Sequence, residues 1–246
     1  MTSNAADTFV DLYERKVDRA REAFRARLAP MFGESDARVL GLFLINFCAQ
    51  GVGMTEPVPG WIRRAGERTQ KQGFEDLGSS LIKHAVHESG HHEMMIADTR
   101  SLVQWWNAHR SPIVDADRFL KQPLSPGVMR YRDLHEHYIE SETPYCQIAI
   151  EYEIEKVSVD FGPKLIAFLA QRLGPEILQS LSFVTEHVAV DVGHTQYNKR
   201  ALGSFLASAP QALDHLVQAG SQALDCYGSY VEDAMALAKE YLRENA

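Results

Sequence analysis

The sequence has little cysteine and no excess of basic charge. Its 246 residues include only three cysteines, Cys48, Cys146 and Cys226, which are widely spaced and odd in number. This pattern predicts buried free thiols in a reducing compartment, not disulfides or a CxxC metal site. Asp and Glu outnumber Lys and Arg by 33 to 25, for a net charge of −8. We therefore expect a cytoplasmic protein whose partner is a small molecule and not a nucleic acid.

Long apolar runs and strand signals are also missing. No stretch approaches about 18 uninterrupted apolar residues, so no membrane span is expected. The start, MTSNAADTFVDLYERK, lacks the basic and then apolar order of a signal peptide. No Asn-Gly or Asp-Gly turn occurs, whereas apolar residues recur at steps of three and four. The sequence predicts an all-α protein, with a single domain over residues 1–246 built as a bundle of seven or eight helices.

Apolar spacing and turn residues predict where the helices begin and end. Pro30 and Gly33 should end the first helix, and Ser35 or Asp36 should cap the second. The second is apolar on nearly every side and is expected at the centre of the bundle. The expected helices are Thr8–Leu28, a second from Ser35 to the break at Pro57 and Pro59, Trp61–Gln72, one from Leu77 or Ser79 to Trp106, a long region from Tyr131 interrupted at Pro144 and at Gly162-Pro163, Leu165–Leu173, Glu176–Ala207 and Gln211–Leu242.

The segment TEHVAVDVGHTQYNKR carries the strongest candidate site. His187, Asp191 and His194 are spaced i, i+4 and i+7, which places them within roughly 60° of one another on one helix face. Two imidazoles and a carboxylate suit Fe(II), Mn(II) or Zn(II). The other interpretation is a polar stripe, but the neighbouring valines make a simply exposed face a poor fit, and burying these groups unpaired is costly.

The segment HAVHESGHHEMMIADTR holds a second cluster. On one helix, His84, His87, Glu88 and His91 would share a face, with His92 about 100° away from His91. Glu88 and His91 form ExxH, a spacing found at carboxylate-bridged di-iron sites. The same residues also form HExxH, the zinc hydrolase motif, in which His87 and His91 would bind zinc and Glu88 would be the general base. A polar helix face that binds nothing is the third interpretation.

A third acidic segment, ETPYCQIAIEYEIEKVSVDFG, lies between these two. Apolar residues cover the predicted helix on two opposite sides, and Glu155 projects with one of them. An unpaired buried carboxylate is expensive, so Glu155 is a candidate metal ligand. Glu151 and Glu153 are the alternatives, and a salt bridge or a surface position remains open for each of the three.

Taken in order, these three segments resemble the heme-oxygenase-like di-iron oxidases and oxygenases, whose fold is related to heme oxygenase, TenA and PqqC. The similarity covers roughly residues 35 to 205, and HxxxDxxH is its most specific element. It implies that two iron ions are held by six ligands, Glu88, His91, Glu155, His187, Asp191 and His194. In many members the first Glu ligand precedes the first His ligand by seven residues. The residue seven positions before His91 is His84, which would then be an extra ligand or a neighbour of one.

The resemblance implies an oxidoreductase that activates O₂ as co-substrate at two Fe(II) ions. The implied reactions are N-oxygenation, desaturation or oxidative C–C cleavage of a small amine, amino acid or fatty acid in a biosynthetic pathway. An external electron donor and a homodimer are both compatible with it. Three alternatives stay open: a metal-independent TenA-like or PqqC-like enzyme, the HExxH zinc hydrolase, and a non-catalytic helical ligand-binding protein.

Overall fold

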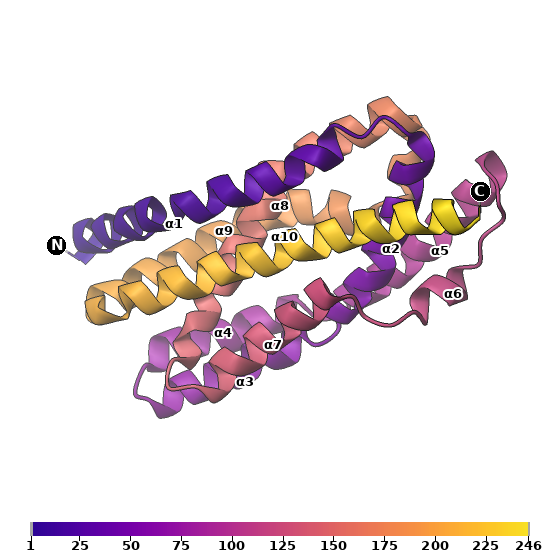
Figure 1. The fold of residues 1–246 in the computed structure, drawn as a ribbon. Helices are drawn as coiled ribbons and strands as arrows, with labels where there is room; N and C mark the ends of the chain where they lie inside the picture. The colour runs from indigo at the N-terminus through magenta and orange to yellow at the C-terminus, as the bar shows by residue number, and fades with distance from the viewer. Residues whose placement is uncertain (1, 246) are drawn as a thin grey trace.

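Helices account for nearly the whole fold (Figure 1). The computed structural model describes residues 2–245, with side chains from residue 6 onward, so Met1 and Ala246 of the expected domain lie outside the described residues. No strand occurs between residues 2 and 245, which confirms the all-α prediction. The α-helices are α1 (Thr2–Phe32), α2 (Ala37–Thr55), α3 (Val58–Lys71), α4 (Glu75–His87), α5 (His91–His109), α6 (Ala116–Leu120), α7 (Pro126–Glu140), α8 (Gln147–Leu173), α9 (Ser182–Ser208) and α10 (Leu213–Glu244), and the 3-10 helices are η1 (Pro144–Cys146), η2 (Pro175–Ser180) and η3 (Pro210–Ala212).

Helix α2 lies at the centre, as its all-round apolar sequence predicts. Asp36 caps it by accepting a hydrogen bond from the backbone N–H of Arg38, and most of its residues are buried against α5 and α10. By length and composition the segment Ala37–Lys71 could cross a membrane, but 83% of its most apolar window is buried inside the fold. That burial is typical of a core helix.

The count of helices exceeds the predicted seven or eight, because the chain bends in places where no break was expected. The largest difference is at Gly90, whose φ of +92° is left-handed and ends helical geometry. The single helix predicted over Leu77–Trp106 is therefore wrong. Helix α4 ends at His87 and α5 begins at His91, with Glu88 in the turn between them.

Two prolines do not end helices as predicted. Pro30 lies in the last turn of α1, where it removes one backbone hydrogen bond, and the helix continues for two more residues to Phe32. Helix α8 passes through Gly162-Pro163 without a break. A Cβ atom at Gly162 would lie 2.2 Å from Cγ2 of Val188, so this glycine allows α8 and α9 to pack closely along their length. Tertiary packing of α8 against α9 outweighs the local preference of Pro163.

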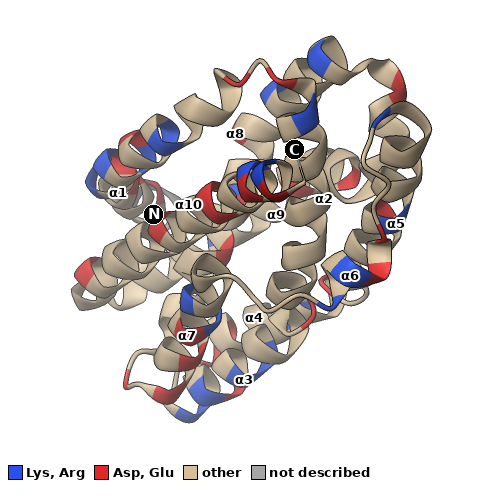
Figure 2. Cartoon of the chain, turned by 45° about the vertical axis from the view of Figure 1, so that its right-hand side comes forward, with Lys and Arg blue, Asp and Glu red and all other residues tan. Residues whose placement is uncertain are grey.

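Ion pairs between helices hold the bundle together around the core. Glu153 of α8 accepts two hydrogen bonds from Arg21 of α1, at 2.7 and 2.8 Å, and a third from the hydroxyl of Tyr13. On the outside, Arg64 of α3 pairs with Glu136 of α7. Figure 2 shows basic and acidic residues intermingled along α3 and α7. The buried Arg21–Glu153 pair fixes the rotation of α8, which in turn sets where its other carboxylates point.

Candidate metal centre

Four helices bring imidazoles and carboxylates to a common cavity. The end of α4 supplies His84, the turn after it supplies Glu88, and α5, α8 and α9 supply the rest. The lining of this inner cavity includes five of the six predicted ligands: Glu88, His91, Glu155, His187 and Asp191. The sixth, His194, lies on α9 one turn beyond Asp191, with its Nδ1 3.4 Å from Asp191 Oδ1.

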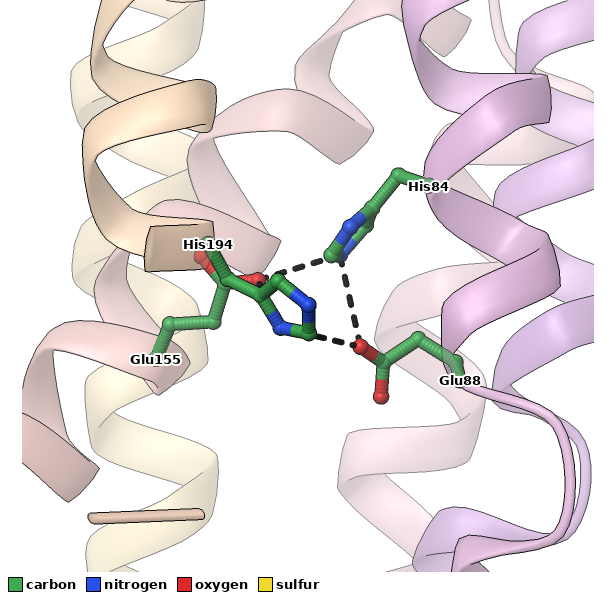
Figure 3. A group of neighbouring side chains, drawn as sticks. All are labelled: His84, Glu88, Glu155 and His194. Carbon is green, nitrogen blue, oxygen red and sulfur yellow. Dashed lines mark ion pairs between the residues drawn. The ribbon is translucent and has the colours of Figure 1, made fainter. Parts of the chain in front are cut away.

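The first ligand group consists of His84, Glu88, Glu155 and His194 (Figure 3). One donor atom from each residue lies within 4.8 Å of the others. His84 Nε2 is 3.1 Å from Glu155 Oε1 and 3.6 Å from Glu88 Oε1. His194 Nδ1 is 3.7 Å from each of the same two oxygens. Donor atoms about 3.0 to 3.4 Å apart are what tetrahedral or octahedral bonds of about 2.1 Å require, so the group is close to the size of a metal site.

The second ligand group consists of Glu88, His91 and His187. Glu88 Oε2 lies 2.9 Å from His91 Nδ1, which is 3.2 Å from His187 Nε2. Glu88 thus belongs to both groups, with Oε1 facing the first and Oε2 facing the second. This is the arrangement of a carboxylate that can bridge two metal ions.

The tautomer of His187 suits a metal ligand. Its Nδ1 donates to the backbone carbonyl of Phe183 at 2.7 Å, which leaves the lone pair on Nε2 facing the second ligand group. Burial lowers the pKa of His187, so the ring favours the neutral form that binds metals. The i to i−4 contact along α9 therefore orients this imidazole before any ion binds.

Several buried polar atoms of the first ligand group have no hydrogen-bond partner. They include both ring nitrogens of His84, Oε1 of Glu155 and Nδ1 of His194. Buried polar groups are nearly always paired, and leaving one unpaired costs about 1–3 kcal/mol. Orphaned donor atoms that converge on one point fit a divalent ion as their missing partner.

The pKa values of Glu155 and Glu88 are shifted in opposite directions by their surroundings. Burial, and then the charge of Asp191, raise the pKa of Glu155 well above its usual value. Burial would also raise the pKa of Glu88, but the bond to His91 and the nearby imidazoles lower it instead. The Glu88 bond raises the pKa of His91 against the effect of its burial. Bound cations would stabilise the ionised form of Glu155, which the protein alone disfavours.

The three acidic residues of α8, Glu151, Glu153 and Glu155, have different surroundings in the structure. Glu155 enters the first ligand group, whereas Glu153 is occupied by Arg21 and Tyr13 and does not reach the cluster. Glu151 lines the inner cavity one turn from Glu155 and accepts a hydrogen bond from Gln147. Burial raises the pKa of Glu151 to about 8, so near neutral pH it is mostly protonated. Glu151 belongs to neither ligand group, and in the metal-free protein it is an uncharged acid beside the cluster.

The remaining histidines of the second segment lie outside both groups. His87 is exposed, with its ring stacked 5.6 Å from that of His194, and the half-buried His92 lies in neither group. The zinc hydrolase motif requires its two histidines on one helix face, but the turn at Gly90 places His87 and His91 in different helices. This geometry does not favour the hydrolase interpretation.

Sequence reasoning missed Asn198, which holds Glu155 in place. Its side-chain nitrogen donates to Glu155 Oε2 at 2.8 Å, and the residue is fully buried. The signal was present in the spacing: Asn198 follows Asp191 and His194 by seven and four residues and so shares their face of α9. An amide on that face was a reason to expect a partner for a carboxylate.

A second cavity, here called the apolar chamber, adjoins the inner cavity. Its lining includes Phe24, Leu28, Val157, Phe161 and Val184, and no Lys, Arg, Asp or Glu contributes to it. The two cavities share four lining residues, Ser158, Phe183, His187 and Tyr227. The candidate metal centre therefore adjoins a hydrocarbon-lined space between α1, α8 and α9.

Comparison with known proteins identifies the fold as heme oxygenase-like. A solved structure from Shewanella denitrificans OS217, described as a domain of unknown function with a heme oxygenase-like fold, superposes with a TM-score of 0.72 at 17% sequence identity. The match covers 93% of each chain. No protein-family model matches this sequence, and no curated protein matches it either. At this identity the similarity establishes the architecture and leaves the chemistry to be argued from the site.

Proposed function

We propose that this protein is a non-heme di-iron oxidase or oxygenase that uses O₂ to oxidise a small substrate. The observation that carries the proposal is the position of Glu88, whose two carboxylate oxygens face two different groups of metal-binding side chains. Imidazole and carboxylate donors without thiolates suit iron in a helical bundle. Glu88, Glu155, Asp191 and His194 would hold one ion, and Glu88, His91 and His187 the other.

When bound, two Fe(II) ions would supply the electrons and the open coordination positions that O₂ activation needs. The surrounding residues orient the ligands, hold a proton and exclude water. The Phe183 carbonyl orients His187, and Asn198 orients Glu155. In the metal-free protein Glu151 keeps a proton near neutral pH, and because its Oε1 accepts from Gln147, Oε2 is the oxygen that can carry it. The apolar chamber excludes water from the adjoining space, which limits side reactions.

The two cavities discriminate among the substrate classes. No Lys or Arg lines either cavity, so the carboxylate of an amino acid or a fatty acid would have to pair with the metal ions themselves. The lining of the apolar chamber suits a hydrocarbon group, which would contact Leu28, Val157 and Phe161, and its free volume of about 60 Å³ suits a short one. Among the amine, amino acid and fatty acid classes, the lining favours a substrate with a short apolar chain, a fatty acid or an alkyl amine.

Other parts of the proposal rest on the sequence. A reducing, cytoplasmic location follows from the cysteine pattern, and all three thiols are free and buried. An external electron donor, a homodimer and a role in biosynthesis remain predictions. The metal-independent enzyme and the non-catalytic binding protein are the alternatives, and metal-dependent O₂ chemistry separates both from the proposal.

The test is the reaction of the iron-loaded protein with O₂. Protein loaded anaerobically with about two equivalents of Fe(II), the number expected for a carboxylate-bridged pair, should give a transient visible absorption band on mixing with O₂. His187→Ala and Asp191→Ala should abolish the band, whereas His109→Ala, a change on α5 away from the cluster, should preserve it. Failure of the wild-type protein to bind iron would refute the proposal.

A further inference from the structure

His84 is more completely buried than any predicted ligand. Its side chain is 1% exposed, and neither ring nitrogen has a hydrogen-bond partner within the described residues. A core histidine usually has at least one ring nitrogen hydrogen-bonded, as His135 has through its Nδ1 to the side-chain amide of Gln147. His84 is therefore buried without the hydrogen-bond partner that a buried imidazole normally has.

The His84 ring is aimed at the carboxylates of the first ligand group. Figure 3 shows the ring between Glu155 and Glu88, facing His194. Nε2 is 3.1 Å from Glu155 Oε1, without a hydrogen bond between them, and the ring meets that of His194 edge to face at 5.2 Å. Glu155 Oε1 is itself unpaired, because Asn198 takes the other oxygen. An ion between these atoms would satisfy three orphaned groups together.

We infer that His84 is a seventh metal ligand, in addition to the six that the family resemblance implies. The inference rests on the proposed function, since it concerns one ion of the same centre. With His84 and His194 on one ion and His91 and His187 on the other, each ion receives two imidazoles and a share of Glu88. Three carboxylates against two divalent ions leave one net positive charge, which suits an anionic substrate group.

A charge-pairing role is the competing explanation for His84. A protonated imidazole between Glu88 and Glu155 would also be attracted to both carboxylates without touching a metal ion. Loss of either role weakens metal binding, because even residues that only support ligands change affinity by about 10–100-fold. The test must therefore detect coordination directly.

Hyperfine-shifted proton NMR of the Co(II)-loaded protein counts coordinated imidazoles. The wild-type chain should bind two Co(II) ions and show four shifted imidazole N–H signals. His84→Gln should lose one signal and bind one of the two ions more than about 10-fold more weakly, beyond the change in His87→Gln. His87 is the matched control because it lies on the same helix but is exposed.

The outcomes separate this inference from the proposed function. Three signals with two bound Co(II) ions in the wild-type protein would overturn the inference and leave the di-metal centre intact, and this count needs no variant to fold. Four signals that all persist in His84→Gln would overturn it as well. A wild-type protein that binds no Co(II) would overturn the inference and the proposed function together.

Discussion

Glu88 Oε2 lies 2.9 Å from Nδ1 of His91, although Glu88 follows the end of α4 and His91 is the first residue of α5. The chain turns at Gly90 between them, and the contact spans this turn. A continuous helix would keep both residues on one face, but it would also keep Glu88 at helical geometry along α4. The turn lets Glu88 direct one oxygen toward each ligand group.

The first prediction concerns this turn. Gly90→Ala should destabilise the protein by about 1 kcal/mol and weaken metal binding, because alanine disfavours the left-handed φ of +92°. A Cβ atom at this position meets no other atom within 4 Å, so the cost comes from the backbone alone. Chemical denaturation and metal titration measure the two effects.

Gly193→Ala is the matched control for Gly90. Gly193 lies exposed in the middle of α9, and a Cβ there also meets nothing within 4 Å. Because its backbone is helical, alanine should stabilise the protein by about 0.5–1 kcal/mol. A Gly90→Ala protein as stable as Gly193→Ala would show that the turn does not depend on glycine.

The second prediction concerns Asn198. Asn198→Ala removes the only hydrogen bond described for Glu155 Oε2, so the affinity for the ion of the first ligand group should fall by about 10–100-fold. Calorimetric titration with Co(II) measures the change, and Gln196→Ala on the exposed side of α9 is the control. Unchanged affinity in a folded Asn198→Ala protein would show that Glu155 needs no such support.

The third prediction concerns the protonation of Glu151. Its pKa is about 8 in the folded protein, whereas an unperturbed glutamate carboxyl has a pKa of 4.5, so between these values the folded state binds the extra proton. Stability of the metal-free protein should then fall with rising pH by up to about 1.4 kcal/mol per pH unit. The effect is absent below pH 4.5 and complete above pH 8.

Glu151→Gln cannot lose a proton and should remove this slope. Denaturation of both metal-free proteins at about pH 5 and about pH 8, near the two ends of that range, should show the variant gaining stability relative to wild type at the higher pH. Glu67→Gln, which changes an exposed carboxylate, controls for the lost charge. A difference between wild type and Glu151→Gln that is the same at both pH values would contradict the assigned protonation.

The fourth prediction concerns the apolar chamber. Val157→Phe fills part of the chamber and should shorten the longest straight-chain acid or amine that accelerates O₂ consumption, while metal stoichiometry stays at the wild-type value. Val192→Phe, an exposed valine on α9, should not change the chain-length preference. A preference unaffected by Val157→Phe would place the substrate elsewhere.

The parts of the site that follow from residue spacing within one helix could be predicted from the sequence. The parts that depend on contacts between distant segments could not. The shared face of His187, Asp191 and His194 follows from spacing on a single helix, and the structure has all three on α9. Apolar spacing favoured Glu155 over Glu153, but the reason that Glu153 lies outside the cluster, its pairing with Arg21 132 residues away in the sequence, could not be predicted. The position of His84 likewise depends on α8 and α9 approaching α4.

The fold likewise combines features that local sequence predicts with features that depend on tertiary packing. Apolar spacing was enough to predict an all-α protein and the central α2. The uninterrupted passage of α8 through Gly162-Pro163 depends on packing against α9, which local sequence does not reveal. At Gly90 the local signal was present, but the strong helical pattern on both sides concealed it.

The position of Glu88 between the two ligand groups leads to the prediction that two iron ions share one centre. Mössbauer spectroscopy of protein loaded with ⁵⁷Fe(II) and then oxidised by O₂ tests this most directly. We expect about two irons per chain, nearly all in a spin-coupled diferric species with no net magnetic moment. One iron per chain, or a paramagnetic signal from isolated Fe(III) ions, would contradict a shared centre.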